Sequence, residues 1–248
     1  MATPVTTESY GPTSKAATMA VFGLFLRELA TRARILVLSS LGLLMVLLGL
    51  VARFSDDGEE IELTMLIALG LGIIAPIISL VMASATIGER RADQSLVYLW
   101  LRPIPFWTIA VGAGAAAITV AMPIVLVSLG LSVLVSGEYQ LFVPALIAGF
   151  LAVVGYTGIF LPLGALLKRS FLVGLGYILI WESLLSQLGN FFEQLSILSY
   201  SASIVVNATD VVTSSGGRST PSSTVIPPLV LLGGIAITVR FLNRREID

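Results

Sequence analysis

The stretch ILVLSSLGLLMVLLGLV, from Ile35 to Val51, carries no charge and shows no alternation of apolar and polar residues. A strand of a membrane-spanning barrel alternates lipid-facing with lumen-facing residues, so this stretch does not fit a barrel. In hydrocarbon every backbone polar group needs a partner within the protein, and a helix supplies one within the segment itself. The stretch therefore predicts a membrane-spanning helix near 35–54.

The composition extends this prediction to the whole chain. Of 248 residues, 56% are hydrophobic and 12% are charged, and the mean hydropathy is +0.97. Soluble domains carry about 25% charged residues. A globule of this length has too little interior to bury so much apolar surface. A bilayer supplies the missing apolar surroundings, and we predict an all-α membrane protein.

Six apolar stretches approach the roughly 20 residues that one crossing of the bilayer needs. They lie near 35–54, 63–87, 106–135, 141–167, 171–189 and 225–242, and together they predict a six-span transmembrane domain over 35–242. The third is too long for one perpendicular crossing and too short for two, so it should tilt or begin along the interface. Pro76, Pro123 and Pro162 lie inside spans and should bend them.

Two segments precede the first span. Residues 1–18 are polar and turn-prone, which predicts a disordered cytoplasmic tail. Over 19–34, apolar residues such as Val21, Phe25 and Leu29 recur at helical spacing with basic residues between them. This pattern favours an amphipathic helix lying in the membrane interface. The alternative is an inner extension of the first span.

The basic residues give an orientation, because Lys and Arg gather in the cytoplasmic loops of membrane proteins. With six spans and the amino end inside, 12 of the 14 Lys and Arg residues fall in inner segments, and only Arg53 and Arg218 fall outside. Both ends, including the tail 243–248, are therefore predicted to be cytoplasmic. The outer segments carry acidic residues, which either bind a cation or form a solvated loop: Asp56, Asp57, Glu59, Glu60, Glu62, Glu138 and Asp210.

The sequence offers no residues for catalysis of its own. The chain has no cysteine and no histidine, which removes thiolate and imidazole metal ligands and the commonest general base. Neither Lys15 nor Lys168 follows the glycines that a phosphate-binding loop requires. We expect no catalytic, metal or cofactor-binding residue here, so the chemistry that drives this protein must come from another chain.

The segment that joins the second and third spans reads GERRADQSLVYLWLRPIP, from Gly88 to Pro105. It begins with charges and continues as an amphipathic run, which Pro103 ends because the residue before a proline is pushed out of the α region. One interpretation is a short helix across the cytoplasmic face that a soluble partner can bind. The other is a basic loop that only fixes the topology.

This segment resembles the permeases of ABC-2 type transporters, whose pattern runs roughly GER-x-x-GTL-x-LL-x-RP-[IV]. Gln94 stands where the family usually has glycine, which suggests a more regular helix. The resemblance implies that 88–105 is a coupling helix, which docks on a separate ATP-binding cassette subunit. The residues that match or flank the pattern are Glu89, Arg90, Arg91, Leu96, Leu99 and Arg102.

The resemblance also implies partners and a topology. ATP and Mg are expected on the partner subunit, and the pump would contain a second membrane subunit, either identical or homologous. The family has six spans and an extended outer segment before the last one, here 190–224. No nucleic-acid partner is expected.

Glu182 is an ionisable residue within the fifth apolar stretch. Such a group costs about 2.5–3.5 kcal/mol on the insertion scale, so it usually faces protein or water. Glu182, Ser186 and Asn190 share one helical face. They either line a substrate route or its outer gate, or the carboxyl is hydrogen-bonded to a neighbouring helix end. Trp181 and Glu182 together also resemble a pairing in actinobacterial ABC-2 permeases.

The run from Gly112 to Ala117 consists of small residues, which allow helices to approach closely. We favour packing within the subunit over a dimer seam.

Three functions fit a chain of this kind. The first is the permease subunit of an ATP-driven ABC-2 type transporter, an exporter in the plasma membrane of a prokaryote. The second is a non-transporting membrane anchor or assembly subunit of a larger complex. The third is an ATP-independent carrier, which usually places paired polar groups at the bilayer midplane. The spans hold little of that kind beyond Glu182, which argues against a carrier.

Overall fold

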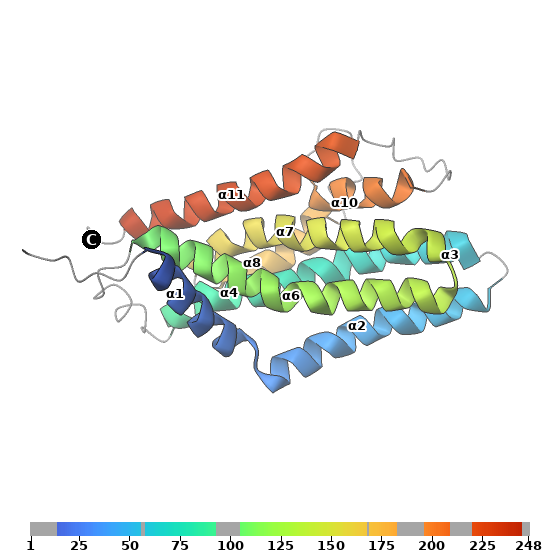
Figure 1. Cartoon of the computed structure of the whole chain (residues 1–248), viewed down its shortest axis with the longest axis horizontal. Helices are drawn as coiled ribbons and strands as arrows, with labels where there is room; N and C mark the ends of the chain where they lie inside the picture. Colours follow the sequence, from blue (N-terminus) through green and yellow to red (C-terminus); the bar gives the residue numbers. More distant parts are fainter. Residues whose placement is uncertain are drawn as a thin grey trace, which may run out of the picture.

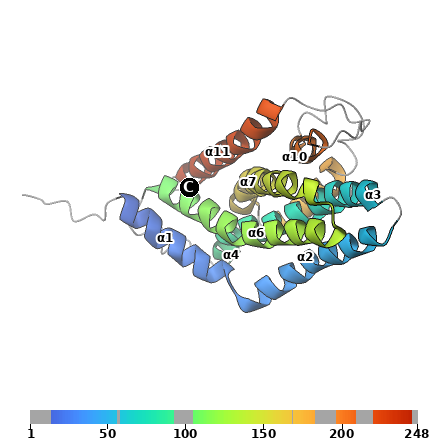
Figure 2. The ribbon, with the colours of Figure 1, turned by 45° about the vertical axis from the view of Figure 1, so that its right-hand side comes forward.

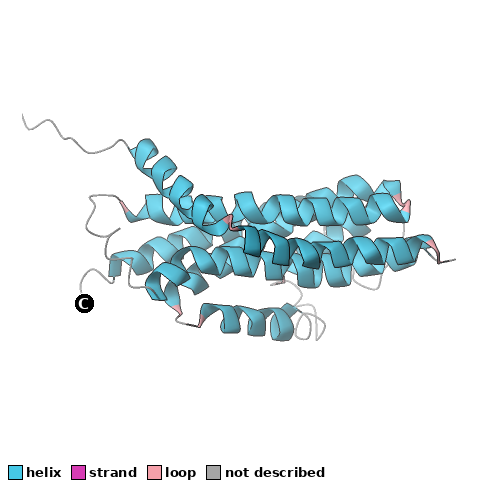
Figure 3. Cartoon of the chain, turned by 90° about the horizontal axis from the view of Figure 1, so that it is seen from below, coloured by secondary structure: helices cyan, strands magenta, loops and turns pink. Residues whose placement is uncertain are grey.

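The computed structural model describes residues 14–55, 58–92, 105–167, 169–182, 196–208 and 220–244, and over these residues it is helical without any strand (Figures 1 and 3). In chain order the elements are α1 Ser14–Leu29, α2 Arg32–Arg53, α3 Gly58–Met65, the π-helix η1 Leu66–Ile74, α4 Ala75–Ala92, α6 Phe106–Ser136, the short 3₁₀-helix η2 Tyr139–Leu141, α7 Phe142–Leu166, α8 Ser170–Gly176, the π-helix η3 Tyr177–Glu182, α10 Ile197–Val206 and α11 Thr220–Arg244.

Five helices within the described residues are long and apolar enough to cross a membrane. They cover Arg32–Arg53, Glu60–Gly88, Phe106–Ser136, Tyr139–Leu166 and Pro221–Arg244, and each matches one predicted span. The fifth predicted span, 171–189, is represented by a shorter apolar helix over Ser170–Trp181. The remainder of that span lies outside the described residues. The all-α class is confirmed, and the five helices are compatible with a multi-pass membrane protein.

In the bundle, α7 lies at the centre, and α2 and α11 lie at the periphery (Figures 1 and 2). In the most apolar part of each span, 72% of α7 residues are buried, but only 22% of α11 residues and 28% of α2 residues are. Large apolar side chains such as Leu47, Leu229 and Leu232 remain exposed on α2 and α11. In water such faces would be costly, so they are the surfaces that lipid or another membrane subunit can cover.

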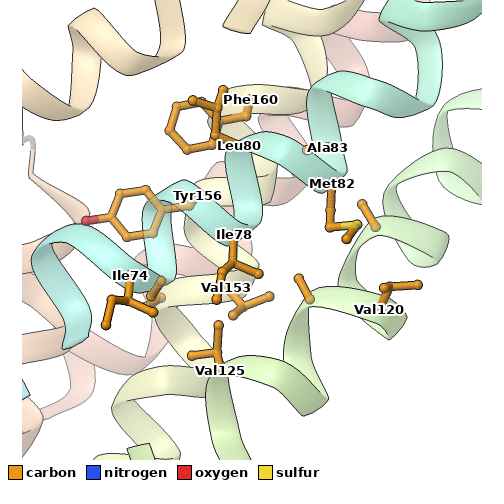
Figure 4. Close-up of a cluster of buried hydrophobic side chains, with 14 of the residues drawn as sticks. Ile74, Ile78, Leu80, Met82, Ala83, Val120, Val125, Val153, Tyr156 and Phe160 are labelled. Carbon is orange, nitrogen blue, oxygen red and sulfur yellow. The ribbon is translucent and has the colours of Figure 1, made fainter. Parts of the chain in front are cut away.

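The core forms where η1, α4, α6 and α7 meet (Figure 4). Ile78 from α4, Val125 from α6 and Tyr156 from α7 are all fully buried in this cluster. Aliphatic and aromatic side chains fill the interior, and the serine and threonine hydroxyls there mostly bond a carbonyl one turn earlier. Ser84 donates to Leu80 O at 2.6 Å in this way.

The second span changes its helical pitch along its length. The π-helix η1 precedes Pro76, and the Ala75 N–H donates to Gly70 O, five residues earlier. Pro76 has no N–H to donate, so the main chain must depart from a regular ladder just before it. Pro123 and Pro162 lie inside α6 and α7, and both helices continue through them.

The third span is one helix of 31 residues, about 46 Å long at 1.5 Å per residue. This exceeds the roughly 30 Å of a hydrocarbon core, as the length of the apolar stretch predicts. Gly137, whose φ is +94°, ends α6 in the left-handed region and allows the turn into η2 and α7.

The amino-terminal helix packs on the first part of α6. Ala17, Val21, Phe25 and Leu29 form a buried stripe at four-residue spacing. Gly112 of α6 permits this contact, because a Cβ atom there would lie 2.8 Å from a Val21 methyl carbon. The prediction that the small-residue run packs within the subunit is therefore confirmed at Gly112.

The bounds of this first helix differ from the predicted 19–34. Helix α1 already begins at Ser14 and ends at Leu29, because Thr31 is extended, with φ −77° and ψ 141°. Arg32 and Arg34 therefore belong to the start of α2.

The two ends of the bundle differ in charge. At one end α4, α7 and α11 end and α1, α6 and α8 begin (Figure 1). We call this the basic end, because it carries Lys15, Arg169, Arg240 and Arg244. At the opposite end α2 passes into α3, and α6 turns into α7. We call this the acidic end, because Glu60, Glu62 and Glu138 outnumber Arg53 there.

Candidate functional site

Glu62 is the only charged side chain in the buried class among the described residues, with 0% of its surface exposed. It lies in α3, where the second span begins at the acidic end. The prediction counted Glu62 among the acidic residues of an outer loop, and the structure corrects this. The helix begins at Gly58, so Glu62 falls on the face that packs inward with Leu63 and Leu66.

Ser132 of α6 joins Glu62 to α2. The Ser132 Oγ atom lies 2.8 Å from Glu62 Oε1 and 3.0 Å from the main-chain oxygen of Met45. Gly49, one turn beyond Met45, makes this approach possible. A Cβ atom at Gly49 would lie only 2.5 Å from the Ser132 carbonyl oxygen. Three helical elements therefore meet at one hydroxyl group.

Neighbouring serines on α6 behave differently. Ser128 donates to Ile124 O within its own helix at 2.6 Å, and Ser136 donates to Val133 O at 2.9 Å. These are the ordinary back-bonds of helical serines. Among these three serines, Ser132 alone reaches across the α2–α6 contact.

Within the described residues, few groups near Glu62 could form a hydrogen bond or an ion pair with it. The second oxygen, Oε2, is buried and has no hydrogen-bond partner within the described residues. Arg53 is exposed and its Nη1 donates to Val135 O at 3.2 Å. On the opposite side of α3, Glu60, Ile61, Thr64 and Met65 line an open cleft of about 350 Å³.

The acidic outer residues were predicted either to bind a cation or to form a solvated loop. Among the described residues no group of three acidic side chains is close enough to hold a metal ion. Asp56, Asp57 and Asp210 lie outside the described residues.

The residues predicted to couple to an ATPase divide into two groups. The backbones of Glu89, Arg90 and Arg91 continue α4 to Ala92, but their side chains lie outside the described set. Leu96, Leu99 and Arg102 lie outside the described residues altogether. Gly88 of α4 lies beside the end of α7 and the start of α8, because a Cβ atom on Gly88 would lie 3.4 Å from both Gly164 O and Ser170 Oγ. Helix α4 thus extends past the point where α7 ends and α8 begins.

The residues predicted to line a substrate route lie at the edge of what the structure describes. Glu182 is the last residue of η3, and its side chain, Ser186 and Asn190 lie outside the described residues. Aromatic rings connect η3 to the core. Tyr156 stacks on Phe160 with centroids 5.9 Å apart, Phe160 meets Tyr177 edge-on at 5.8 Å, and Tyr177 stacks on Trp181 at 6.4 Å.

Within the predicted outer segment 190–224, the structure describes α10 and the first residues of α11. Ser196 caps the amino end of α10 by accepting a hydrogen bond from the Ser199 N–H at 3.2 Å. The hydroxyls of Ser203 on α10 and Ser223 on α11 lie 2.6 Å apart and are buried. This bond fixes α10 against the start of the last span.

The burial of Glu62 was not predicted from the sequence. One signal was present, since Glu62, Leu66 and Gly70 recur at four-residue spacing and so share a helical face. Its partner Ser132 is 70 residues away in the chain, and no local pattern connects the two. Comparison with models of known protein families and with curated protein sequences gives no match.

Proposed function

We propose that this chain is the membrane-spanning permease subunit of an ATP-driven ABC-2 type transporter, an exporter in the plasma membrane of a prokaryote. The observation that carries this proposal is the course of α4. This helix takes the sequence Gly88-Glu89-Arg90-Arg91, which begins the ABC-2-like segment, past the point at the basic end where α7 ends and α8 begins. A segment that docks on a cytoplasmic subunit has to extend beyond the neighbouring helices at the cytoplasmic end of the bundle.

The course of the chain supports six spans. Helix α7 ends and α8 begins at the basic end, whereas α11 begins nearer the acidic end and runs back to the basic end (Figure 1). One more crossing between Leu166 and Thr220 would connect these two helix ends. Helices α8 and η3 supply the first part of that crossing, over Ser170–Glu182.

The charge of the two ends supports the orientation. Basic residues mark the cytoplasmic side of membrane proteins. Helix α1 begins and α11 ends at the basic end (Figure 1). Lys15 is the second residue of α1, and Arg244 is the last residue of α11. We therefore propose that both termini are cytoplasmic and that the acidic end faces outward.

The packing of α1 supports an interfacial helix. Since α6 exceeds the hydrocarbon thickness by about 16 Å, its first turns extend beyond the core if its other end lies at the outer surface. Helix α1 packs on this part of α6, at Gly112. Met19, Leu24 and Arg27 on its other sides are exposed, which suits a helix held between lipid headgroups and protein.

An ATPase subunit is an essential part of the proposal, because the chain lacks a phosphate-binding loop and histidine. ATP and Mg would be held by that partner. A second copy or homologue of this chain would complete the pump, and Glu182, Ser186 and Asn190 would line the substrate route. The exposed apolar faces of α2 and α11 leave room for both lipid and a second membrane subunit.

Purification from native membranes tests the proposal. A tagged full-length chain, extracted in mild detergent, should bring down one nucleotide-binding subunit in a near one-to-one ratio, with ATP hydrolysis that needs Mg. An unrelated tagged membrane protein of the same cell is the control. Recovery of the chain with other membrane proteins but without any ATPase would favour the anchor or assembly subunit instead.

A further inference from the structure

We propose that Glu62 is a proton-binding site, a neutral carboxyl group whose O–H donates to Ser132 and joins α2, α3 and α6 at the acidic end. This inference does not depend on the transport function. Its ligand is a proton, taken up by the carboxylate from water to form the carboxylic acid.

The hydrogen count at Ser132 is the first argument. A serine hydroxyl has one hydrogen to donate and lone pairs to accept. Ser132 Oγ nevertheless lies within hydrogen-bond distance of two oxygens, Glu62 Oε1 at 2.8 Å and Met45 O at 3.0 Å. An ionised Glu62 would leave one of these contacts without a hydrogen. A neutral Glu62 satisfies both, because Glu62 donates to Ser132 and Ser132 donates to Met45.

The burial of Glu62 is the second argument. The side chain is 0% exposed, and its Oε2 atom has no hydrogen-bond partner within the described residues. One hydrogen-bond donor offsets only a small part of the desolvation free energy of a buried carboxylate. Buried charges are therefore paired or neutralised. A neutral carboxyl needs no counter-ion.

Among the described residues, the charged groups on the surrounding elements do not supply a counter-ion. Helix α6 and the π-helix η1 contain no charged residue. From α2, the exposed Arg53 donates to Val135 O. Glu138, in the turn after α6, and the exposed Glu60, on α3 itself, are both acidic and favour a neutral neighbour. Glu59 is a further acidic residue of α3, but its side chain lies outside the part of the chain that the structure describes.

The proton on Glu62 would therefore stabilise the contact of α2 and α3 with α6. Gly42 and Gly49 bring α2 against Ser128 and Ser132 without space for a methyl group. Loss of the proton would put an unpaired negative charge into this tight contact. The acidic-end parts of α2 and α3 would then separate from α6, and water would reach the carboxylate.

Infrared spectroscopy of the full-length protein in lipid tests the assignment. A neutral carboxyl gives a carbonyl stretching band that a carboxylate lacks. We expect wild type to show such a band at neutral pH, Glu62→Gln to lose it, and Glu60→Gln to keep it. Glu60→Gln is the matched control, since it makes the same change two residues away at an exposed position. A wild-type spectrum without a Glu62-dependent band would overturn the proposal.

A second pair of variants keeps the test decisive if Glu62→Gln does not fold. Ser132→Ala removes the acceptor of the carboxyl proton, so the band should shift in frequency. Ser128→Ala removes a hydroxyl that bonds only its own helix, so the band should stay where it is. Equal spectra for Ser132→Ala, Ser128→Ala and wild type would contradict the proposed bond.

Discussion

Gly234 of α11 lies directly against the main chain of Gly158 of α7, so that a Cβ atom on Gly234 would overlap the Gly158 carbonyl oxygen. The contact is mutual, since a Cβ atom on Gly158 would lie 2.6 Å from the Leu231 Cα atom. Backbone-to-backbone contact of this kind needs small residues on both helices. It holds the last span, which is otherwise mostly exposed, on the central helix of the bundle.

We predict that Gly158→Ala and Gly234→Ala each destabilise the protein by about 1–3 kcal/mol, because an added methyl group must push two helices apart. Gly233→Ala is the matched control. No atom lies within 4 Å of its added Cβ, and alanine favours a helix by about 0.5–1 kcal/mol over glycine. Thermal unfolding in detergent measures all three. Equal stability of the 233 and 234 variants would contradict this packing.

A second prediction concerns the docking of α1. Gly112→Leu should displace α1 from α6, because the leucine side chain would occupy the position of Val21. The chain has no cysteine, so a single Phe25→Cys change gives a specific probe at a fully buried position. The thiol should react slowly in the Gly112 background and rapidly with Gly112→Leu. Rapid reaction in both backgrounds would show that α1 is not docked.

The orientation of the bundle gives a third prediction. A cysteine replacing exposed Glu60 should react with a membrane-impermeant thiol reagent in intact cells. One replacing exposed Arg169 should react only after the cells are opened. These two sites lie at the acidic and basic ends of the bundle. The reverse pattern would invert the proposed topology.

The fourth prediction concerns Glu182 as part of a substrate route. Glu182→Gln keeps the size of the side chain but removes its charge, so transport or substrate-stimulated ATP hydrolysis should change while expression and thermal stability stay near wild type. Failure of this variant to fold would assign the carboxyl a structural role. Glu60→Gln, at an exposed site, controls for loss of a negative charge.

The apolar stretches predicted most of the fold because each crossing needs a long uncharged run, which is a local property of the sequence. The bounds of α2 and α7 follow the predicted spans closely, whereas α11 begins at Thr220, five residues before the predicted start of the last span. The break at Thr31 was not predicted, because the residues on both sides favour a helix. The π-helix before Pro76 was not predicted either, since hydropathy carries no information on helical pitch.

The candidate sites also differ in how far local sequence could predict them. Charge counting treated Glu62 as a loop residue because it lies beside other acids, and its burial depends on Ser132 and Gly49, which are far away in sequence. The proposed coupling residues came from a resemblance in 88–105. The structure continues α4 through Glu89 and Arg90, and the roles of the proposed coupling residues stay predictions.

Binding of an ATPase subunit by the segment 88–105 can be tested by the amount of that subunit retained after charge reversal. Glu89→Arg with Arg90→Glu preserves net charge but reverses the proposed contact. Leu96→Ala with Leu99→Ala removes the apolar part, where truncation at a binding hot spot costs more than about 1 kcal/mol. Arg169→Glu with Arg244→Glu changes charges at the same end outside the segment.

Quantitative mass spectrometry of the purified complex gives the ratio of ATPase subunit to this chain, and transport is measured in parallel. We expect a reduced ratio, or ATP hydrolysis that no longer drives transport, for both variants in 88–105, and a wild-type ratio with normal transport for the control. A wild-type ratio with undiminished transport in all variants would contradict binding of an ATPase subunit by 88–105 and leave the membrane anchor as the better function.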